Sequence, residues 1–227
     1  EHPNEGPILM GQHMGSDGVF VGPIYKFVWK KKSFEKGPKI PFPKETILFG
    51  LTMADLRGDG KLHIIQFDPH EHLIVLSSDG KKLWNSSERY GGTSNFYDTT
   101  KKKQEPFRPQ ESPPFRVYIP GRILVRDLDG DGVPEIIVNK NEFKTGTMFQ
   151  RVRSYEKGVI QNLIWEENGL MANWKTIEIK GYIADYQLKD AQNSGEDQLV
   201  VAIVGYEQEG TTFFSKDKSN IFFFKLF

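Results

Sequence analysis

Three aspartates alternate along the stretch DLDGDGVPE, at Asp127, Asp129 and Asp131. Carboxylates this close repel one another, by roughly 4 kcal/mol for a pair 4 Å apart at an effective dielectric of 20, so a positive charge is expected among them. Oxygen donors at positions 1, 3 and 5, a glycine at 6 and a backbone carbonyl at 7 match the first part of a calcium loop. Position 7 is Val133 and position 9 is Glu135. The segment therefore predicts a Ca²⁺ site made by these four carboxylates and the Val133 carbonyl.

Short β-branched runs flank this loop, RILVRD before it and PEIIVNK after it. Such runs predict strands, so the loop joins two strands. An EF-hand would need helices on both sides and an acidic ligand at position 12, where this chain has Val138. A second interpretation stays open, because Asp-Gly is a strong turn signal and the loop could be a solvated hairpin turn without metal.

The same pattern recurs along the chain, in ADLRGDGKLHIIQFD at 54–68, in KDAQNSGEDQLVVAIV at 189–204, and in part at the start, in NEGPILMGQ. Four glycines align in these copies, at Gly6, Gly60, Gly132 and Gly195. Their intervals suit one propeller blade each. We therefore predict an all-β fold, a β-propeller of four-stranded antiparallel blades. About four blades would form a single unit, with approximate bounds 1–47, 48–118, 119–178 and 179–227.

The first and last blades are expected to be incomplete. In the third blade we assign the four strands to RILVRDLD, PEIIVNK, RVRSYEK and QNLIWEEN. By the same assignment the first blade lacks its opening strand and the last lacks its closing strand. This would leave apolar edges at Phe222, Phe223 and Phe224 open to pairing with another chain. We therefore expect the chain to be part of a larger chain or assembly, with upstream sequence or a partner chain supplying the missing strands.

The copies differ at the positions that would bind metal. In the copy at 54–68, Arg57 stands between Asp55 and Asp59, and His63 replaces the acid at position 9. The guanidinium can neutralise both aspartates, so no calcium is expected there. The last copy is a weaker second metal candidate with a single charge, and its alternative is a polar turn held by its own hydrogen bonds. Its donors are Asp190, Gln192, Ser194 and Gln198.

The stretch DLDGDGVPEIIV and its weaker partners resemble the FG-GAP or VCBS repeat, the calcium-loop blade also found in the propellers of integrin α-subunits. The wider pattern, including ILMGQHMGSDGVFVGPIYKFVW and FRVYIPGRILVRDLDGDG, is similar to VCBS-repeat proteins of Gram-negative bacteria. The resemblance covers most of the chain. It implies a propeller that serves adhesion, assembly or ligand binding, and occasionally catalysis. Arg57, His63 and Gln198 depart from the family's liganding pattern.

Two loops could carry recognition. The longer one, at 87–118, places Tyr90, Phe96 and Tyr97 among small polar residues, a composition typical of adaptable binding loops. The alternative is a solvated insert whose aromatic side chains fold back onto the blade. The loop at 205–220 is similar in kind. His70 and His72 could share a strand face but have no third ligand nearby, so we expect an exposed turn.

The tryptophans read as packing residues within or between blades, with a sugar platform as the alternative; they are Trp29, Trp84, Trp165 and Trp174. The chain has 227 residues, no cysteine and a formal net charge of zero, so thiol chemistry is excluded and no overall field favours nucleic acid. No apolar run reaches the length of a membrane-spanning helix.

These observations predict a calcium-stabilised extracytoplasmic propeller, in the periplasm, at the cell surface or secreted, and the resemblance implies a Gram-negative bacterial source. Extracellular modules bind calcium with dissociation constants of about 0.1 to 1 mM, which suits this compartment. The protein would act as a binding, adhesion or assembly module with a protein or glycan partner. The alternative is a polysaccharide lyase or hydrolase with its site on the propeller axis, since carboxylate pairs from distant blades are compatible with the sequence.

Overall fold

A computed structural model describes residues 8–16, 18–44, 46–102, 114–143, 153–206 and 217–226. Within these ranges every regular element is a β-strand, and all strand pairs are antiparallel. The predicted all-β class is therefore confirmed. The described residues contain no helix of the length and apolarity needed to cross a membrane.

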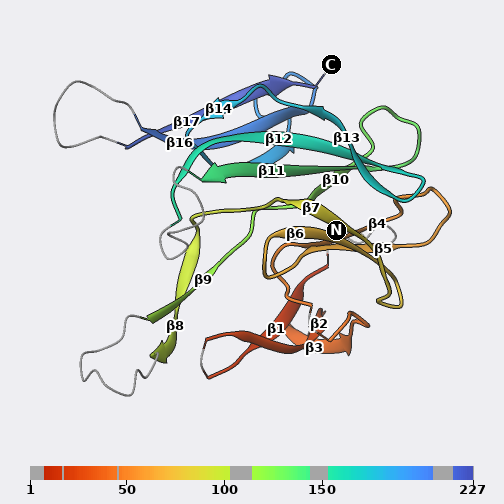
Figure 1. Ribbon diagram of the computed structural model, residues 1–227. Coiled ribbons are helices and arrows are strands. Elements are labelled where there is room, and N and C mark those ends of the chain that lie inside the picture. The colour runs from red at the N-terminus through yellow and green to blue at the C-terminus, as the bar shows by residue number, and fades with distance from the viewer. Residues whose placement is uncertain are drawn as a thin grey trace.

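Four sheets of three or more strands follow one another along the chain, with a two-stranded sheet between the second and the third (Figure 1). The first sheet has three strands: β1 (Met10–Met14), β2 (Phe20–Lys30) and β3 (Ser33–Lys39). The second sheet has four: β4 (Leu51–Ala54), β5 (His63–Phe67), β6 (His72–Ser77) and β7 (Lys82–Arg89). A two-stranded hairpin comes next: β8 (Phe96–Lys102) and β9 (Pro114–Tyr118).

The last two sheets have five and three strands. The third sheet contains β10 (Leu124–Arg126), β11 (Glu135–Phe143), β12 (Tyr155–Glu166), β13 (Gly169–Lys175) and β14 (Ile179–Lys180). The fourth sheet contains β15 (Tyr182–Lys189), β16 (Gln198–Tyr206) and β17 (Asp217–Lys225). Because β14 pairs with β12, the third sheet extends to Lys180.

The expected division of the third blade is wrong in its second half. RVRSYEK and QNLIWEEN are not two strands, because Tyr155–Glu166 forms one continuous strand, β12. The hairpin that follows it turns at Glu167 and Asn168, and Gly169 begins β13. The Asn-Gly step is the stronger turn signal, whereas Gly158 within β12 serves close packing: a Cβ there would lie 2.4 Å from Asn141 Oδ1.

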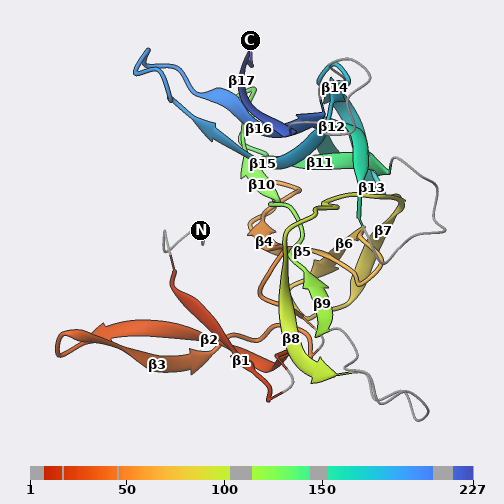
Figure 2. The same ribbon diagram turned by 90° about the vertical axis from the view of Figure 1, so that its left-hand side faces the viewer.

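Two apolar cores join three of the sheets face to face. One lies between the second and third sheets and includes Ile65, Val75, Ile136 and Leu163. The other lies between the third and fourth sheets and includes Ile137, Ile160, Leu199 and Val201. The first sheet lies beyond the second (Figures 1 and 2), where Gln12 bonds to the backbone of Thr46 and Leu48. The described residues form an open series of sheets and no closed ring.

Candidate metal centre

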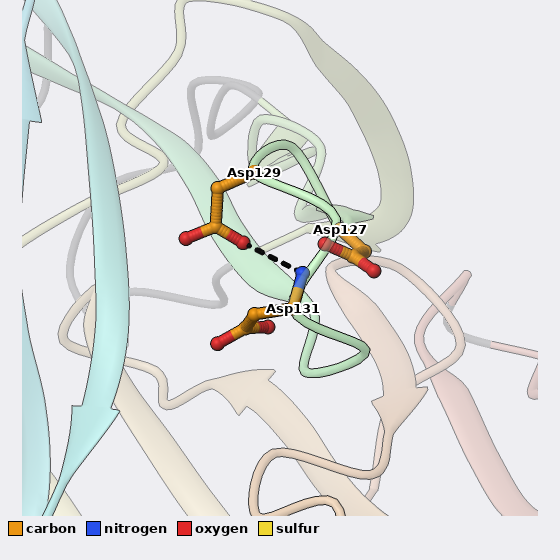
Figure 3. A group of neighbouring side chains, drawn as sticks. All are labelled: Asp127, Asp129 and Asp131. Atoms are coloured by element: carbon orange, nitrogen blue, oxygen red, sulfur yellow. Dashed lines mark hydrogen bonds between the residues drawn. The ribbon is translucent and has the colours of Figure 1, made fainter.

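The loop between β10 and β11 brings the three predicted aspartates together (Figure 3). Each of Asp127, Asp129 and Asp131 offers a carboxylate oxygen, and these three oxygens lie within 4.8 Å of one another on exposed side chains. Gly130 and Gly132 give the loop its tight path, with φ values of 79° and 89° that other residues rarely adopt.

Backbone N–H groups hold the three carboxylates in place. Asp127 accepts the N–H of Gly132 at 2.9 Å and that of Gly130 at 2.7 Å. Asp129 accepts the N–H of Asp131 at 3.1 Å, and Asp131 that of Val133 at 2.7 Å. Among the described residues, no basic side chain forms an ion pair with these aspartates. The loop therefore presents three fixed oxygen donors, of the kind that Ca²⁺ prefers, without a protein cation to neutralise them.

Glu135 differs from the three aspartates in its surroundings. Its side chain is buried, and its Oε2 accepts the N–H of Leu128 at 2.7 Å, which closes the base of the loop. Burial raises the pKa of the Glu135 carboxyl, the hydrogen bond from Leu128 opposes this, and the charges of Asp129 and Asp127 raise it further. A cation held by the aspartates would lower the same pKa. The three convergent carboxylates of Asp127, Asp129 and Asp131 form a donor set that fits a divalent cation. Glu135 is not one of the side chains in this group of three convergent carboxylates.

The loop between β4 and β5 has the same framework and a different chemistry. Asp55 accepts the N–H groups of Gly60 at 2.6 Å and of Asp59 at 3.2 Å. Arg57 does not pair with these aspartates as predicted. Its guanidinium lies over the ring of Trp165 in the third sheet, 4.9 Å from the centroid, because that aromatic face is within its reach.

His63 also turns away from this loop's aspartates. Its ring is buried and stacks beside Trp165, with centroids 5.9 Å apart. Its Nδ1 accepts the N–H of Leu56 at 3.4 Å. Burial, together with the charge of Arg57, lowers the pKa of His63. The side chains at positions 3 and 9 thus serve the contact between two sheets, and this loop presents no convergent group of ligands.

In the loop between β15 and β16, the weaker candidate, Asp190 accepts the N–H groups of Gly195 and Ser194, each at 2.8 Å. Gln198 donates its side-chain N–H to Gln192 Oε1 at 3.1 Å, so two of the four proposed donors bond to each other. This arrangement is the polar turn held by its own hydrogen bonds. It brings the four residues together but leaves one carboxylate as its only charge.

The three aromatic residues proposed for recognition lie in different environments. Tyr90 is buried in the core between the second and third sheets, with its hydroxyl donating to Glu88 at 3.1 Å, so it follows the alternative in which the aromatic side chains fold back onto the sheets. Phe96 is exposed and Tyr97 is half-buried. Both belong to β8, which pairs with β9, so part of the expected loop is a hairpin. Residues 103–113 of this segment, and 207–216 of the loop at 205–220, lie outside the described residues.

The four tryptophans also differ in their burial. Trp84 and Trp165 pack against the core between the second and third sheets, as expected. Trp174 is half-buried on β13. Trp29 is 63% exposed and contacts Phe34 on β3 of the same sheet, so it does not pack between sheets of the described residues. His70 lies at the exposed turn between β5 and β6, as expected, whereas His72 begins β6 and is half-buried. His72 Nδ1 is 3.1 Å from Asp68 Oδ2.

Sequence reasoning missed a polar network that joins the second, third and fourth sheets. Asn141 on β11 donates to the carbonyls of Gly92 and Ile183, at 2.8 and 2.9 Å, and accepts the N–H of Ile183. Tyr186 on β15 accepts the N–H of Asn139 at 3.1 Å. The signal was the stretch NKN at 139–141, which places two amides on one face of an otherwise apolar strand.

A comparison of the chain with protein-family models and with curated proteins found no match in either set.

Proposed function

We propose that the loop at Asp127–Glu135 binds one Ca²⁺ and that this ion stabilises a propeller-type stack of sheets which acts as a binding, adhesion or assembly module outside the cytoplasm. The observation that carries the proposal is the convergence of three uncompensated carboxylates on a loop whose backbone already holds them in place. The resemblance to FG-GAP and VCBS repeats supports the same function.

The proposed role of the ion is structural. The side chains of Asp127, Asp129 and Asp131 would hold it, with Glu135 and the Val133 carbonyl as further ligands implied by the spacing. Bound Ca²⁺ supplies charge neutralisation for three carboxylates that otherwise repel one another. The same loop packs onto the fourth sheet through Leu128, and Arg126 pairs with Asp197 across that contact. Ordering this loop would therefore stabilise the contact between the third and fourth sheets.

The regular alternation of loop and sheet supports the propeller. Each of the last three sheets begins with a strand, a loop with aspartate at position 1 and glycine at position 6, and a second strand. The next sheet, where one is present, covers the face of that sheet. A protein or glycan partner would meet the loops and faces of this stack, where adhesion and assembly propellers of the resembled family bind.

Thermal melts in EDTA and in millimolar calcium, together with metal analysis of the purified protein, test the proposal. An ion that binds only the native state stabilises it by RT ln(1 + [L]/Kd), about 2.7 kcal/mol at a hundredfold excess over Kd. We expect a calcium-dependent rise in Tm and about one bound ion per chain. Identical melts in EDTA and calcium would reject the calcium site.

A further inference from the structure

The central strand of the fourth sheet is apolar on both faces but covered on only one. β16 contains the run LVVAIV at 199–204. Leu199, Val201 and Ile203 are buried in the core shared with the third sheet, whereas the residues that alternate with them, such as Val200 and Ala202, are only half-buried. A continuous apolar run is typical of a strand that is buried on both faces.

The edge strand beside it repeats this pattern. On β17, Phe224 packs into the core shared with the third sheet. Ile221 and Phe223 point to the opposite face, where they are 63% and 46% exposed. Phe223 lies opposite Val200 and Ile221 opposite Ala202. These four side chains form one apolar patch, which we call the tail face.

The residues of the second and third sheets that correspond to the tail face are covered by the sheet that follows. When the sheets are aligned on their Asp-Gly loops, Ile65, Ile137 and Val200 fall in one column. Ile65 packs against the third sheet and Ile137 against the fourth, and both are fully buried. Val200 is the one member of the column without a following sheet in the part of the chain that the structure describes.

The first sheet has the complementary open surface at the other end of the stack (Figures 1 and 2). One side of the first sheet carries Gln12 on β1 and Ile24 on β2, which pair with each other. On this side Gln12 bonds to the linker before the second sheet. Trp29 points to the other side and packs edge-on against Phe34, with centroids 5.0 Å apart. These two rings are 63% and 54% exposed, and Leu9, nearby, is 49% exposed. We call this surface the head face.

In the third sheet, the residue that corresponds to Trp29 of the head face is covered by the preceding sheet. Trp165 stands near the end of β12 as Trp29 stands near the end of β2, each on the strand that leads into a hairpin turn and opposite the strand that follows it. Trp165 is covered by Arg57 and His63, which the loop of the preceding sheet supplies. Trp29 is therefore exposed at the place where the loop of a preceding sheet would pack.

We propose that two copies of this chain associate head to tail, so that the tail face of one copy packs on the head face of the other. The contact would repeat the sheet-to-sheet packing found twice within the chain. Head-to-tail contacts are heterologous, and they close into a ring when the rotation between copies allows it.

Sedimentation velocity and light scattering of the purified chain over a range of concentrations test this proposal. We expect a concentration-dependent dimer. Trp29→Lys and Ile221→Lys each place a charge in one open face at an already exposed position, and each should weaken association by at least about tenfold. Met171→Lys is the matched control, because Met171 is 56% exposed on the third sheet and belongs to neither face. Circular dichroism of each variant verifies the fold.

A mixing experiment separates head-to-tail association from pairing of like faces. Trp29→Lys chains retain a tail face and Ile221→Lys chains retain a head face, so the two variants should associate when mixed although neither does so alone. Association of the Trp29→Lys chain with itself would instead show tail-to-tail pairing and overturn the proposal. A wild-type chain that stays monomeric at the highest concentration would do the same.

The experiments can reject the calcium site and the head-to-tail contact independently of each other. The open faces contain none of the three aspartates, and association is measured in EDTA as well as in calcium. Dimers without a calcium response would reject the metal site alone. A calcium response in a strictly monomeric chain would reject the head-to-tail contact alone.

Discussion

Gly132 donates its backbone N–H to Asp127 Oδ2 across five residues, at 2.9 Å. The other two loops repeat this bond, from Gly60 to Asp55 at 2.6 Å and from Gly195 to Asp190 at 2.8 Å. In each loop the first aspartate therefore acts as an internal acceptor that shapes the turn. The capacity to bind metal depends on the other side chains, which differ between copies and can be changed without removing this bond.

The fifth position of the loop allows a matched test of calcium binding. Asp131 accepts the N–H of Val133 at 2.7 Å, and Asp59, its counterpart, accepts the N–H of Lys61 at 3.0 Å. Asp131→Asn removes one ligand charge, and we expect a loss of calcium affinity of about tenfold or more. At a calcium concentration a hundred times the original Kd, a tenfold loss would reduce the stabilisation from about 2.7 to about 1.4 kcal/mol. Calcium titrations followed by thermal melts measure this.

Asp59→Asn is the control for that substitution, since it makes the same chemical change in a loop that we do not expect to bind calcium. Its calcium response should equal that of the wild-type protein. Equal losses in both variants would argue against a specific site at Asp127–Asp131 and in favour of general charge screening.

Arg57 should stabilise the protein through Trp165 and not through its neighbouring aspartates. Arg57→Ala removes a cation–π contact, for which we expect a cost of about 0.5 to 1 kcal/mol in the free energy of unfolding, equal with and without calcium. Lys61→Ala in the same loop is the control, and its cost should be near zero, because Lys61 is exposed and lies 3.7 Å from Asp59. Urea denaturation measures both. A calcium response that appears only in Arg57→Ala would support the neutralising role that the sequence suggested.

The sequence predicted the features that depend on local patterns. The Asp-Gly loops, the strands on either side of them and the three-stranded first and last sheets all follow from turn residues between apolar runs. The division of β12 into two strands was wrong because RVRSYEK and QNLIWEEN read as separate runs, and the Asn-Gly step that follows them was overlooked.

The features that sequence reasoning missed depend on contacts between sheets. Nothing local distinguishes Trp29, which is exposed, from Trp165, which Arg57 covers. Tyr90 stands among small polar residues yet enters the core, because the chain crosses there from the second sheet toward the third. Such placements depend on which surface lies opposite, and the period of a single strand does not contain that information.

Tyr186 tests the polar network between the third and fourth sheets. Its buried hydroxyl accepts the N–H of Asn139 and donates to the carbonyl of Arg122. Tyr186→Phe would leave a buried N–H without its acceptor, which we expect to cost about 1 to 3 kcal/mol. Tyr90→Phe is a suitable control, because the buried Tyr90 hydroxyl donates to Glu88 at 3.1 Å and no N–H loses its acceptor. Equal costs in urea denaturation would show that the Asn139 contact contributes no particular stability.

The ion pair between Glu71 and Arg153 should make a variant's stability depend on pH. The side chains are 13% and 19% exposed. Burial raises the pKa of Glu71, and the charge of Arg153 opposes this. Arg153→Met removes that opposition, so the pKa should rise further. A carboxyl whose pKa is raised by folding contributes stability that is complete below its unfolded value, near 4.3, and is lost as pH rises through the folded value.

We therefore expect Arg153→Met to leave the free energy of unfolding nearly unchanged at about pH 4 and to lower it by about 2 to 3 kcal/mol at neutral pH. This value lies below the full range for deeply buried ion pairs, because some solvent reaches this pair. The double variant Glu71→Gln/Arg153→Met has no carboxyl to protonate, so it should lose the pH dependence and recover stability at neutral pH. Denaturation curves between pH 4 and pH 8 measure both variants. A cost for Arg153→Met that is the same at every pH would mean that Arg153 stabilises the protein by packing against Tyr118, over whose ring it lies at 3.9 Å, and not through the charge of Glu71.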